Sequence, residues 1–188
     1  MSKHALHPVD VPVALHLLDR PADPYAGLAS DLEISSSTAH QSVRRLFAAG
    51  LLRHGFHGER AVNRQALLEF LTHGVRYAFP TAPAASTRGV ATAHAGPALR
   101  EAIVADDAIV WPAEDGECEG AAIEPFWPRA ASVARKLPTL YALLSAVDAL
   151  RVGRARERQL ATAYLTRVIL RRDAATEEPA PRLVASIG

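Results

Sequence analysis

The stretch that decides the expected fold runs from Tyr25 to Leu52 and reads YAGLASDLEISSSTAHQSVRRLFAAGLL. Its beginning, 25–32, has helical composition, and a longer helix is predicted over 37–49. The apolar positions of that longer helix recur with a helical period and are Ala39, Val43, Leu46 and Phe47. Only residues 33–36 separate the two helices, and Gly50 suits a left-handed C-terminal cap, so the pattern predicts two helices joined by a tight turn.

Further elements are predicted on both sides of this stretch. A short helix is expected over 11–19, where Pro12 suits a first helical position because its missing N–H is not needed there. Two short extended segments around a glycine-bracketed turn predict a β-hairpin over 51–62. Another helix is expected over 64–73, and Gly74 is expected to end it. The resulting order is helix, helix, tight turn, helix, hairpin, helix.

This order resembles the winged helix-turn-helix DNA-binding core of MarR-like and IclR-like bacterial regulators. The resemblance covers residues 10–75 and lies in Leu28-Ala29, Ile34-Ser35, Ser37-Thr38, Arg45-Leu46 and Ala49-Gly50-Leu51-Leu52. It implies a transcriptional regulator that binds double-stranded DNA, and a repressor is expected. Such a protein is expected to act as a homodimer whose paired recognition helices read two half-sites. Glu33 departs from the pattern, because many such proteins have glycine in the turn, and a left-handed backbone there would strain any other residue.

The face of the 37–49 helix opposite its apolar stripe carries the side chains expected to contact DNA. Arginine reads guanine and glutamine reads adenine in the major groove, so Gln41 and Arg44 are the expected base readers. Hydroxyls and free N–H groups at the helix start suit phosphate, and the hairpin is expected to reach the flanking DNA. The predicted contacts are Ser36, Ser37, Thr38, His40, Gln41, Arg44 and Arg45 on the helix, and Arg53, His54, His57 and Arg60 on the hairpin. The alternative for each of them is an ordinary solvent-exposed position.

Charge is distributed unevenly along the chain of 188 residues, whose net charge is +1. Residues 1–75 have no net charge but contain seven of the eight histidines, residues 76–128 carry −5, and residues 129–188 carry +6. An acidic middle is a poor surface for DNA, because it repels the phosphate backbone. The two ends are therefore the candidates for nucleic-acid contact.

The rest of the chain is expected to be a proline-rich connection, 79–127, followed by a helical accessory or dimerisation region, 128–173, and a flexible tail, 174–188. In the connection a helix is expected near 97–105 and short strands are possible around 109–111 and 121–123. The helices expected after it are 130–136, 139–152 and 154–172, with a break at Gly153. Their apolar stripes suit either a dimer seam or an intramolecular core. With the winged helix-turn-helix domain over 1–78, the predicted fold class is mainly α with a small β-wing.

No pattern in the sequence indicates catalysis, a metal or a cofactor. The phosphate-binding glycine loop with lysine, the nucleophile elbow and the zinc-protease helix are all missing, so an enzyme is not expected. His54 and His57 are loosely spaced for metal ligands, and Cys118 is the lone cysteine. No run of about 18 apolar residues predicts a membrane span, and no hydrophobic segment follows Met1, so a cytoplasmic protein is expected.

A second hypothesis is a protein-interaction module that binds a partner protein, as an antitoxin does, and autoregulates its operon. The candidate surfaces are the acidic middle and the arginine-rich stretch Arg151–Arg158. Those arginines suit a docking surface for phosphate, for an acidic protein or for the acidic middle of a second subunit. The alternative is a helix face with internal ion pairs, because Asp148 with Arg151 and Arg154 with Glu157 have helical spacing.

Overall fold

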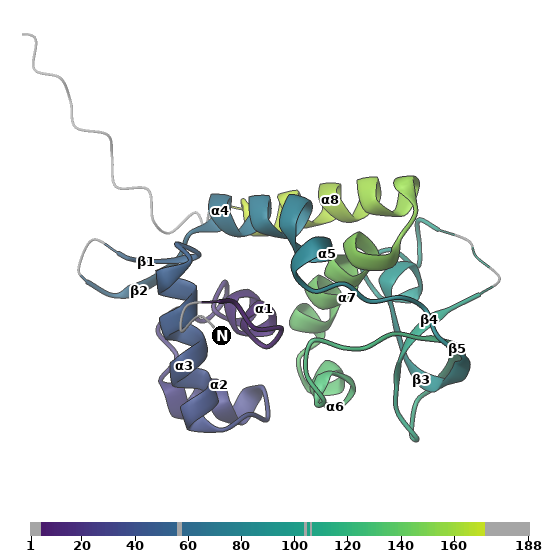
Figure 1. Ribbon diagram of the computed structural model, residues 1–188, viewed down its shortest axis with the longest axis horizontal. Helices are drawn as coiled ribbons and strands as arrows, with labels where there is room; N and C mark the ends of the chain where they lie inside the picture. The colour runs from purple at the N-terminus through teal and green to yellow at the C-terminus, as the bar shows by residue number, and fades with distance from the viewer. Residues whose placement is uncertain (1–4, 56–57, 104, 106, 172–188) are drawn as a thin grey trace, which may run out of the picture.

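The N-terminal part of the protein contains three short helices and a hairpin in the order that the sequence predicts (Figure 1). This computed structural model describes residues 5–55, 58–103, 105 and 107–171. Strands β1 and β2 are antiparallel, with Leu52 opposite Val62. The elements are α1 Asp10–His16, α2 Tyr25–Asp31, α3 Ser36–Ala48, β1 Leu52–His54 and β2 Arg60–Val62.

The turn between α2 and α3 is built by two polar residues. Glu33 has a φ of +51°, so the left-handed backbone considered from the sequence is present without glycine. Ser35 caps α3, and its Oγ accepts a hydrogen bond of 3.0 Å from the backbone N–H of Thr38. This cap starts α3 one residue earlier than the sequence predicted.

The helix after the hairpin does not end at Gly74, and that expectation is wrong. Helix α4, Arg64–Glu69, passes through a π-helical turn, Phe70–Gly74, into α5, Val75–Ala78. The backbone of Gly74 stays helical, and burial of Val75 stabilises the helix beyond it. The helix ends at Ala78, because Phe79 precedes Pro80 and the residue before a proline avoids the helical region.

The segment 79–127 contains a small sheet of three strands. They are β3 Ser86–Thr92, β4 Ile109–Pro112 and β5 Cys118–Ala122. Strand β3 is antiparallel to both others, while β4 and β5 pair in parallel, so the sheet closes on itself. Two of these strands match the possible strands of the sequence, and β3 was not predicted. At Gly89 a Cβ would lie 2.2 Å from the carbonyl oxygen of Trp111, so this close approach requires glycine.

The helix expected near 97–105 is absent from the described part of that segment. A 3-10 helix, Ala93–Ala95, is followed by hydrogen-bonded turns. Leu99 is buried and Ile103 is partly buried against the core, but Arg100, Glu101 and Ala102 are exposed, so only one apolar residue follows Leu99. A single turn with so little to bury does not propagate into a helix.

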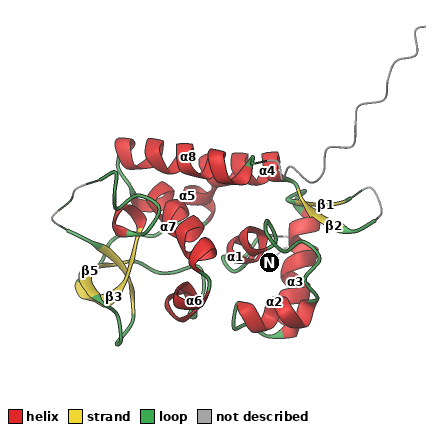
Figure 2. Cartoon of the chain, turned by 180° about the vertical axis from the view of Figure 1, so that it is seen from behind, coloured by secondary structure: helices red, strands yellow, loops and turns green. Residues whose placement is uncertain are grey.

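Helices α6, Ala130–Lys136, α7, Pro138–Val152, and α8, Ala155–Ile169, confirm the predicted C-terminal helices, with Gly153 between the last two. Helix α7 packs against α1, α5, α6, α8 and β3. Figure 2 shows α8 and α4 along one edge of the molecule. The sheet that contains β3 and β5 lies at one end, and the β1–β2 hairpin lies at the other. The apolar stripe of α7 is buried within the chain, so it forms an intramolecular core.

The N- and C-terminal parts share one core and are joined by polar contacts at the α2–α3 turn. The Trp127 indole Nε1 donates a hydrogen bond of 2.9 Å to the carbonyl oxygen of Leu32. Ser132 Oγ and Lys136 Nζ, both on α6, donate to the carboxylate of Glu33. The turn is therefore fixed from the C-terminal side of the molecule. None of the helices in the described residues is long and apolar enough to cross a membrane.

A buried ion pair on α7 joins the small sheet to the helices. Asp148 is fully buried and accepts hydrogen bonds from Thr92 Oγ1 at 2.8 Å, Trp111 Nε1 at 2.6 Å and Arg151 Nη1 at 2.8 Å. Arg151 also donates from Nε to the carbonyl oxygen of Phe79 at 2.9 Å. Burial raises the pKa of Asp148, while Arg151 and the two neutral donors lower it.

We expect Asp148→Ala to destabilise the protein by about 3–5 kcal/mol, because Arg151 would remain buried without its counter-ion. The free energy of unfolding in urea measures this change. The matched control is Asp107→Ala at an exposed position, where the effect should stay within about 0.5 kcal/mol. Equal effects of the two substitutions would contradict the structural role given to this pair.

The contribution of Glu33 to stability should depend on pH. The hydrogen bonds from Lys136 and Ser132 lower the pKa of Glu33, because they favour its ionised form. Its stabilising effect is therefore present above the unfolded-state value of about 4.3 and is lost as the pH falls through the lowered folded-state pKa. Glu33→Gln should destabilise by less than about 1 kcal/mol at pH 7, and the difference from wild type should shrink as the pH falls through the lowered folded-state pKa of Glu33.

Thermal unfolding of both proteins between pH 3.5 and pH 7 measures this dependence. Glu114→Gln, at an exposed position, serves as the control and should change stability little at neutral pH. A Glu33→Gln difference that stays constant over the whole pH range would show that the carboxylate contacts do not stabilise the turn.

Candidate nucleic-acid interface

Helix α3 presents a polar face to solvent and buries its apolar stripe against α1 and α2. Ala39, Val43 and Leu46 are buried, as their helical spacing predicted. The exposed positions on the other side are Ser36, Ser37, His40, Gln41, Arg44 and Ala48. Most of the contact residues predicted on the helix therefore share one accessible face.

The two expected base readers lie on this face and are accessible. Gln41 Nε2 donates a hydrogen bond of 3.2 Å to Ser37 Oγ, one turn earlier. Arg44 is exposed, and within the described part of the chain its guanidinium has no hydrogen-bond or ion-pair partner. An exposed amide and a free guanidinium, three residues apart on a helix, can approach adjacent base pairs in a major groove.

The start of α3 is less open to phosphate than the sequence suggested. The backbone N–H of Thr38 is bound to Ser35 Oγ, and the Thr38 hydroxyl lies 2.8 Å from the same atom. Thr38 is also half-buried, whereas Ser36 and Ser37 are exposed. Ser36 and Ser37 are therefore the better placed of the three for a phosphate.

Arg45 does not lie on the exposed face, and its predicted outward orientation is wrong. Its Nε and Nη2 donate to the two carboxylate oxygens of Asp10 at 2.8 and 2.7 Å, across the α1–α3 contact. The side chains of Arg45 and Asp10 are only 11% and 2% exposed. The reason is a bidentate pairing with a buried carboxylate, which the periodicity of α3 alone did not reveal.

The hairpin adds two accessible residues beside the C-terminal end of α3. Arg53 and His54 are exposed on β1. The His54 ring stacks on Phe47 of α3, with centroids 4.7 Å apart, and its Nδ1 lies 3.4 Å from the carbonyl oxygen of Gly58. His57, the other predicted hairpin histidine, lies outside the described residues.

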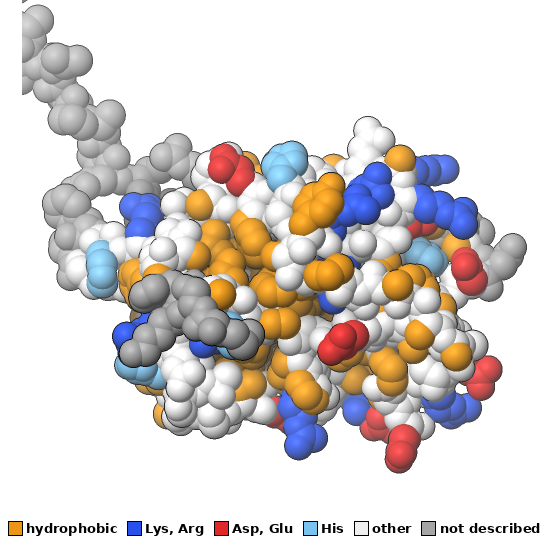
Figure 3. Space-filling view, viewed as in Figure 1, with side chains coloured by type: hydrophobic (Ala, Val, Ile, Leu, Met, Phe, Trp, Pro, Cys, Tyr) orange, Lys and Arg blue, Asp and Glu red, His pale blue; other side chains and the backbone are white. Residues whose placement is uncertain are grey.

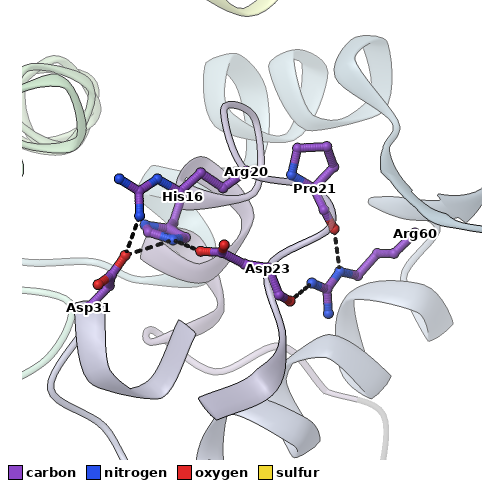
Figure 4. A network of polar contacts seen from close by, with 6 residues as sticks. All are labelled: His16, Arg20, Pro21, Asp23, Asp31 and Arg60. Carbon is purple, nitrogen blue, oxygen red and sulfur yellow. Dashed lines mark hydrogen bonds and ion pairs between the residues drawn. The ribbon is translucent and has the colours of Figure 1, made fainter. Parts of the chain in front are cut away.

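Arg60 is held by the loop between α1 and α2, which corrects its expected position as a free side chain of the hairpin. Its Nε donates to the carbonyl oxygen of Pro21 at 3.0 Å, and its Nη2 donates to that of Asp23 (Figure 4). The guanidinium also lies 5.4 Å from the centroid of the Tyr25 ring. These contacts give Arg60 a structural role, since they fix the hairpin to the loop.

A few basic and histidine side chains lie along the edge of the molecule that α3 and the hairpin form, and other Lys and Arg side chains lie over the opposite half (Figure 3). The acidic side chains visible in the same view lie mostly over the other half of the molecule. This arrangement reflects the sequence, whose negative net charge is concentrated in residues 76–128. Among the described residues, the edge that carries α3 shows no large acidic patch in this view that would repel a polyanion.

The arginine-rich stretch Arg151–Arg158 does not form one exposed cluster. This corrects the idea that the whole stretch is a docking surface. Arg151 is buried with Asp148. Arg158 Nη1 donates to the carbonyl oxygen of Gly153 at 2.8 Å, and Glu157 accepts from the backbone N–H of Arg154. The expected ion pair of Asp148 with Arg151 is confirmed, and Arg154 and Arg156 are the exposed members.

A group of potential metal ligands that the sequence did not reveal lies behind the loop that Arg60 holds. His16 Nε2 lies 3.0 Å from Asp23 Oδ2 and 3.6 Å from Asp31 Oδ2 (Figure 4). The three residues come from α1, the following loop and α2. Their spacing of seven and eight residues matches no familiar ligand motif, and only the path of the proline-containing loop brings them together.

Comparisons of the chain with protein families, with curated proteins and with solved structures find no match. The function of the protein must therefore be argued from its own geometry and chemistry. Two features of that geometry are distinctive: the open polar face of α3 and the His16–Asp23–Asp31 group.

The two neighbouring arginines of α3 should respond differently to substitution. Arg45→Ala should reduce the free energy of unfolding by about 3–5 kcal/mol, because Asp10 would remain buried without its counter-ion. Arg44→Ala is the matched control on the same helix and should change stability by less than about 0.5 kcal/mol. Urea denaturation distinguishes the two, and a stable Arg45→Ala variant would show that the pair with Asp10 is dispensable.

Proposed function

We propose that this protein is a sequence-specific double-stranded DNA-binding regulator, with α3 as its recognition helix and the β1–β2 hairpin as its wing. The observation that carries the proposal is the exposed face of α3, on which Gln41 and Arg44 are accessible beside a tight, capped turn. The order of helices and hairpin is that of a winged helix-turn-helix. The proposal includes action in the cytoplasm.

The dimensions of α3 suit a major groove. Its 13 residues span about 20 Å at 1.5 Å per residue, and its solvent-facing side has small or polar residues. A major groove about 12 Å wide admits one such helix, and Ala48 keeps the exposed face narrow. In this arrangement Gln41 and Arg44 read base edges, while Ser36 and Ser37 bind phosphate at the helix start.

Few cations are available for the phosphate backbone on one protomer. Arg45 and Arg60 are committed to internal contacts, so Arg44 and Arg53 are the exposed arginines of α3 and the hairpin in the described part of the chain. Nonspecific binding by one protomer should therefore be weak, because its strength grows with the number of phosphates neutralised. We infer that the protein acts as a homodimer on a two-fold site and represses transcription by occupying it.

The test is a fluorescence-anisotropy titration of the full-length protein against the DNA upstream of its own coding region, with a scrambled duplex for comparison. Gln41→Ala/Arg44→Ala should weaken specific binding by roughly 30-fold or more, because each good base contact contributes about 1–3 kcal/mol of discrimination. Arg53→Ala should weaken binding to both duplexes alike and lower the salt dependence by about one unit of slope.

Arg156→Ala is the matched control, because Arg156 is an exposed arginine on α8, outside the proposed interface. Its affinity for both duplexes should equal that of wild type. If the folded wild-type protein binds neither duplex, or binds both equally at moderate salt, the regulator proposal fails. The N-terminal part would then be a scaffold for a protein partner.

A further inference from the structure

The ligand atoms of the His16–Asp23–Asp31 group lie close enough together to bind one cation. One imidazole nitrogen and two carboxylate oxygens converge, and these ligand atoms all lie within 4.8 Å of one another. The His16 side chain is only 4% exposed, whereas those of Asp23 and Asp31 are 23% and 29% exposed. The histidine therefore forms the inner wall of the group, and the two carboxylates border solvent (Figure 4).

These three atoms cannot all act as acceptors toward one another, so a hydrogen or a metal ion must lie between them. A carboxylate only accepts hydrogen bonds, and an unprotonated Nε2 also only accepts. Either a proton on Nε2 or a metal ion must therefore be shared by the group. The Arg20 side chain contacts Asp31 at 2.9 Å, whereas among the described residues Arg20 is bonded to His16 and Asp23 through its backbone alone.

Two of the distances within the group are close to the edge length of a metal coordination tetrahedron. An ion held at 2.0–2.1 Å from each ligand separates neighbouring ligand atoms by about 3.3 Å. The two measured separations from His16 Nε2, 3.0 and 3.6 Å, lie on either side of that value. Small side-chain rotations of Asp23 and Asp31, which are partly exposed, would complete the geometry.

The donor set favours a transition metal over the common alkaline-earth ions. Mg²⁺ and Ca²⁺ prefer sites made entirely of oxygen, with six or more ligands, whereas imidazole nitrogen suits Zn²⁺ and its neighbours. Two carboxylates balance the charge of a divalent ion. Arg20 adds one positive charge nearby, but its side chain is 55% exposed, so it can swing into solvent at little cost.

We propose that His16, Asp23 and Asp31 bind one divalent transition-metal ion, Zn²⁺ above all, with the fourth position open to water. The site is partly preorganised, because Arg60 holds the carbonyl groups of Pro21 and Asp23 and so fixes the loop that presents the Asp23 carboxylate. The ion would join α1 to α2. This inference does not depend on DNA binding.

The experiment is a Zn²⁺ titration of the full-length protein, stripped of metal, in competition with a chromophoric chelator. The wild type should bind one Zn²⁺ per chain, and Asp23→Asn and Asp31→Asn should each lower the affinity by at least about 100-fold, since loss of even an outer-shell partner costs about 10–100-fold. Asn keeps the size of the side chain, and circular dichroism checks that both variants fold. Asp19→Asn, which changes an exposed aspartate at the start of the same loop, should bind as the wild type does.

Thermal unfolding gives a second readout of the same site. At a hundredfold excess of free Zn²⁺ over Kd, the wild-type Tm should rise by roughly 5–10 °C, because the ion binds the folded state. The rise should vanish in the Asp23→Asn and Asp31→Asn variants and persist in Asp19→Asn. Mg²⁺ at the same concentration should leave the Tm unchanged.

Three results would overturn the proposal. The first is a folded wild-type protein that does not bind Zn²⁺ at micromolar concentrations. The second is Zn²⁺ binding that Asp23→Asn and Asp31→Asn leave intact, which would assign the ion to other histidines. The third is an equal effect of Mg²⁺, which would reduce the group to a nonspecific acidic surface or a proton-linked ion pair.

Discussion

The buried ion pair between Asp148 and Arg151 is the constraint on which the C-terminal half depends. A carboxylate taken fully out of water must be hydrogen-bonded, and Thr92, Trp111 and Arg151 donate to its two oxygens. Those donors come from β3, β4 and α7, so one desolvated charge specifies how the closed sheet lies on the central helix. Arg151 extends the constraint to the end of α5 through the carbonyl group of Phe79. The sheet, two helices and the chain between them therefore share one set of polar contacts.

The same half of the molecule then determines the conformation of the α2–α3 turn. Trp127 binds the carbonyl group of Leu32, and α6 binds the carboxylate of Glu33, whose left-handed backbone would otherwise be disfavoured. A glycine would adopt that backbone without strain but would lack the carboxylate. Glu33 thus adopts a disfavoured backbone conformation, but its carboxylate connects the turn to α6. The exposed face of α3 is held by a core that spans the described chain, rather than by an isolated small domain.

Local patterns predicted most of the helices and little of the polar architecture. The α2–α3 pair, the hairpin and α6 to α8 follow from apolar periodicity, glycines and prolines within short windows. Strand β3 escaped prediction because only Gly89 and Thr92 of it are buried, so its sequence shows no alternation of apolar and polar residues. The accessible face of α3 was predicted except for Arg45, whose partner Asp10 lies 35 residues away. The His16–Asp23–Asp31 group depends in the same way on the path of a loop that carries no metal-site spacing.

Some arginines of α3 and the hairpin make internal contacts and others are exposed, and this difference bears on the proposed recognition of DNA. Arg45 pairs with Asp10, and Arg60 donates to backbone carbonyl groups. These internal contacts leave the proposed interface with few positive charges. An interface of this kind gains little from phosphate attraction, so most of its preference for one sequence must come from base contacts and from pairing two protomers. Weak attraction to random DNA is an advantage for such a protein, because competing nonspecific sites in a genome are numerous. The internal use of two arginines is therefore compatible with specificity, provided that Gln41 and Arg44 supply the base contacts.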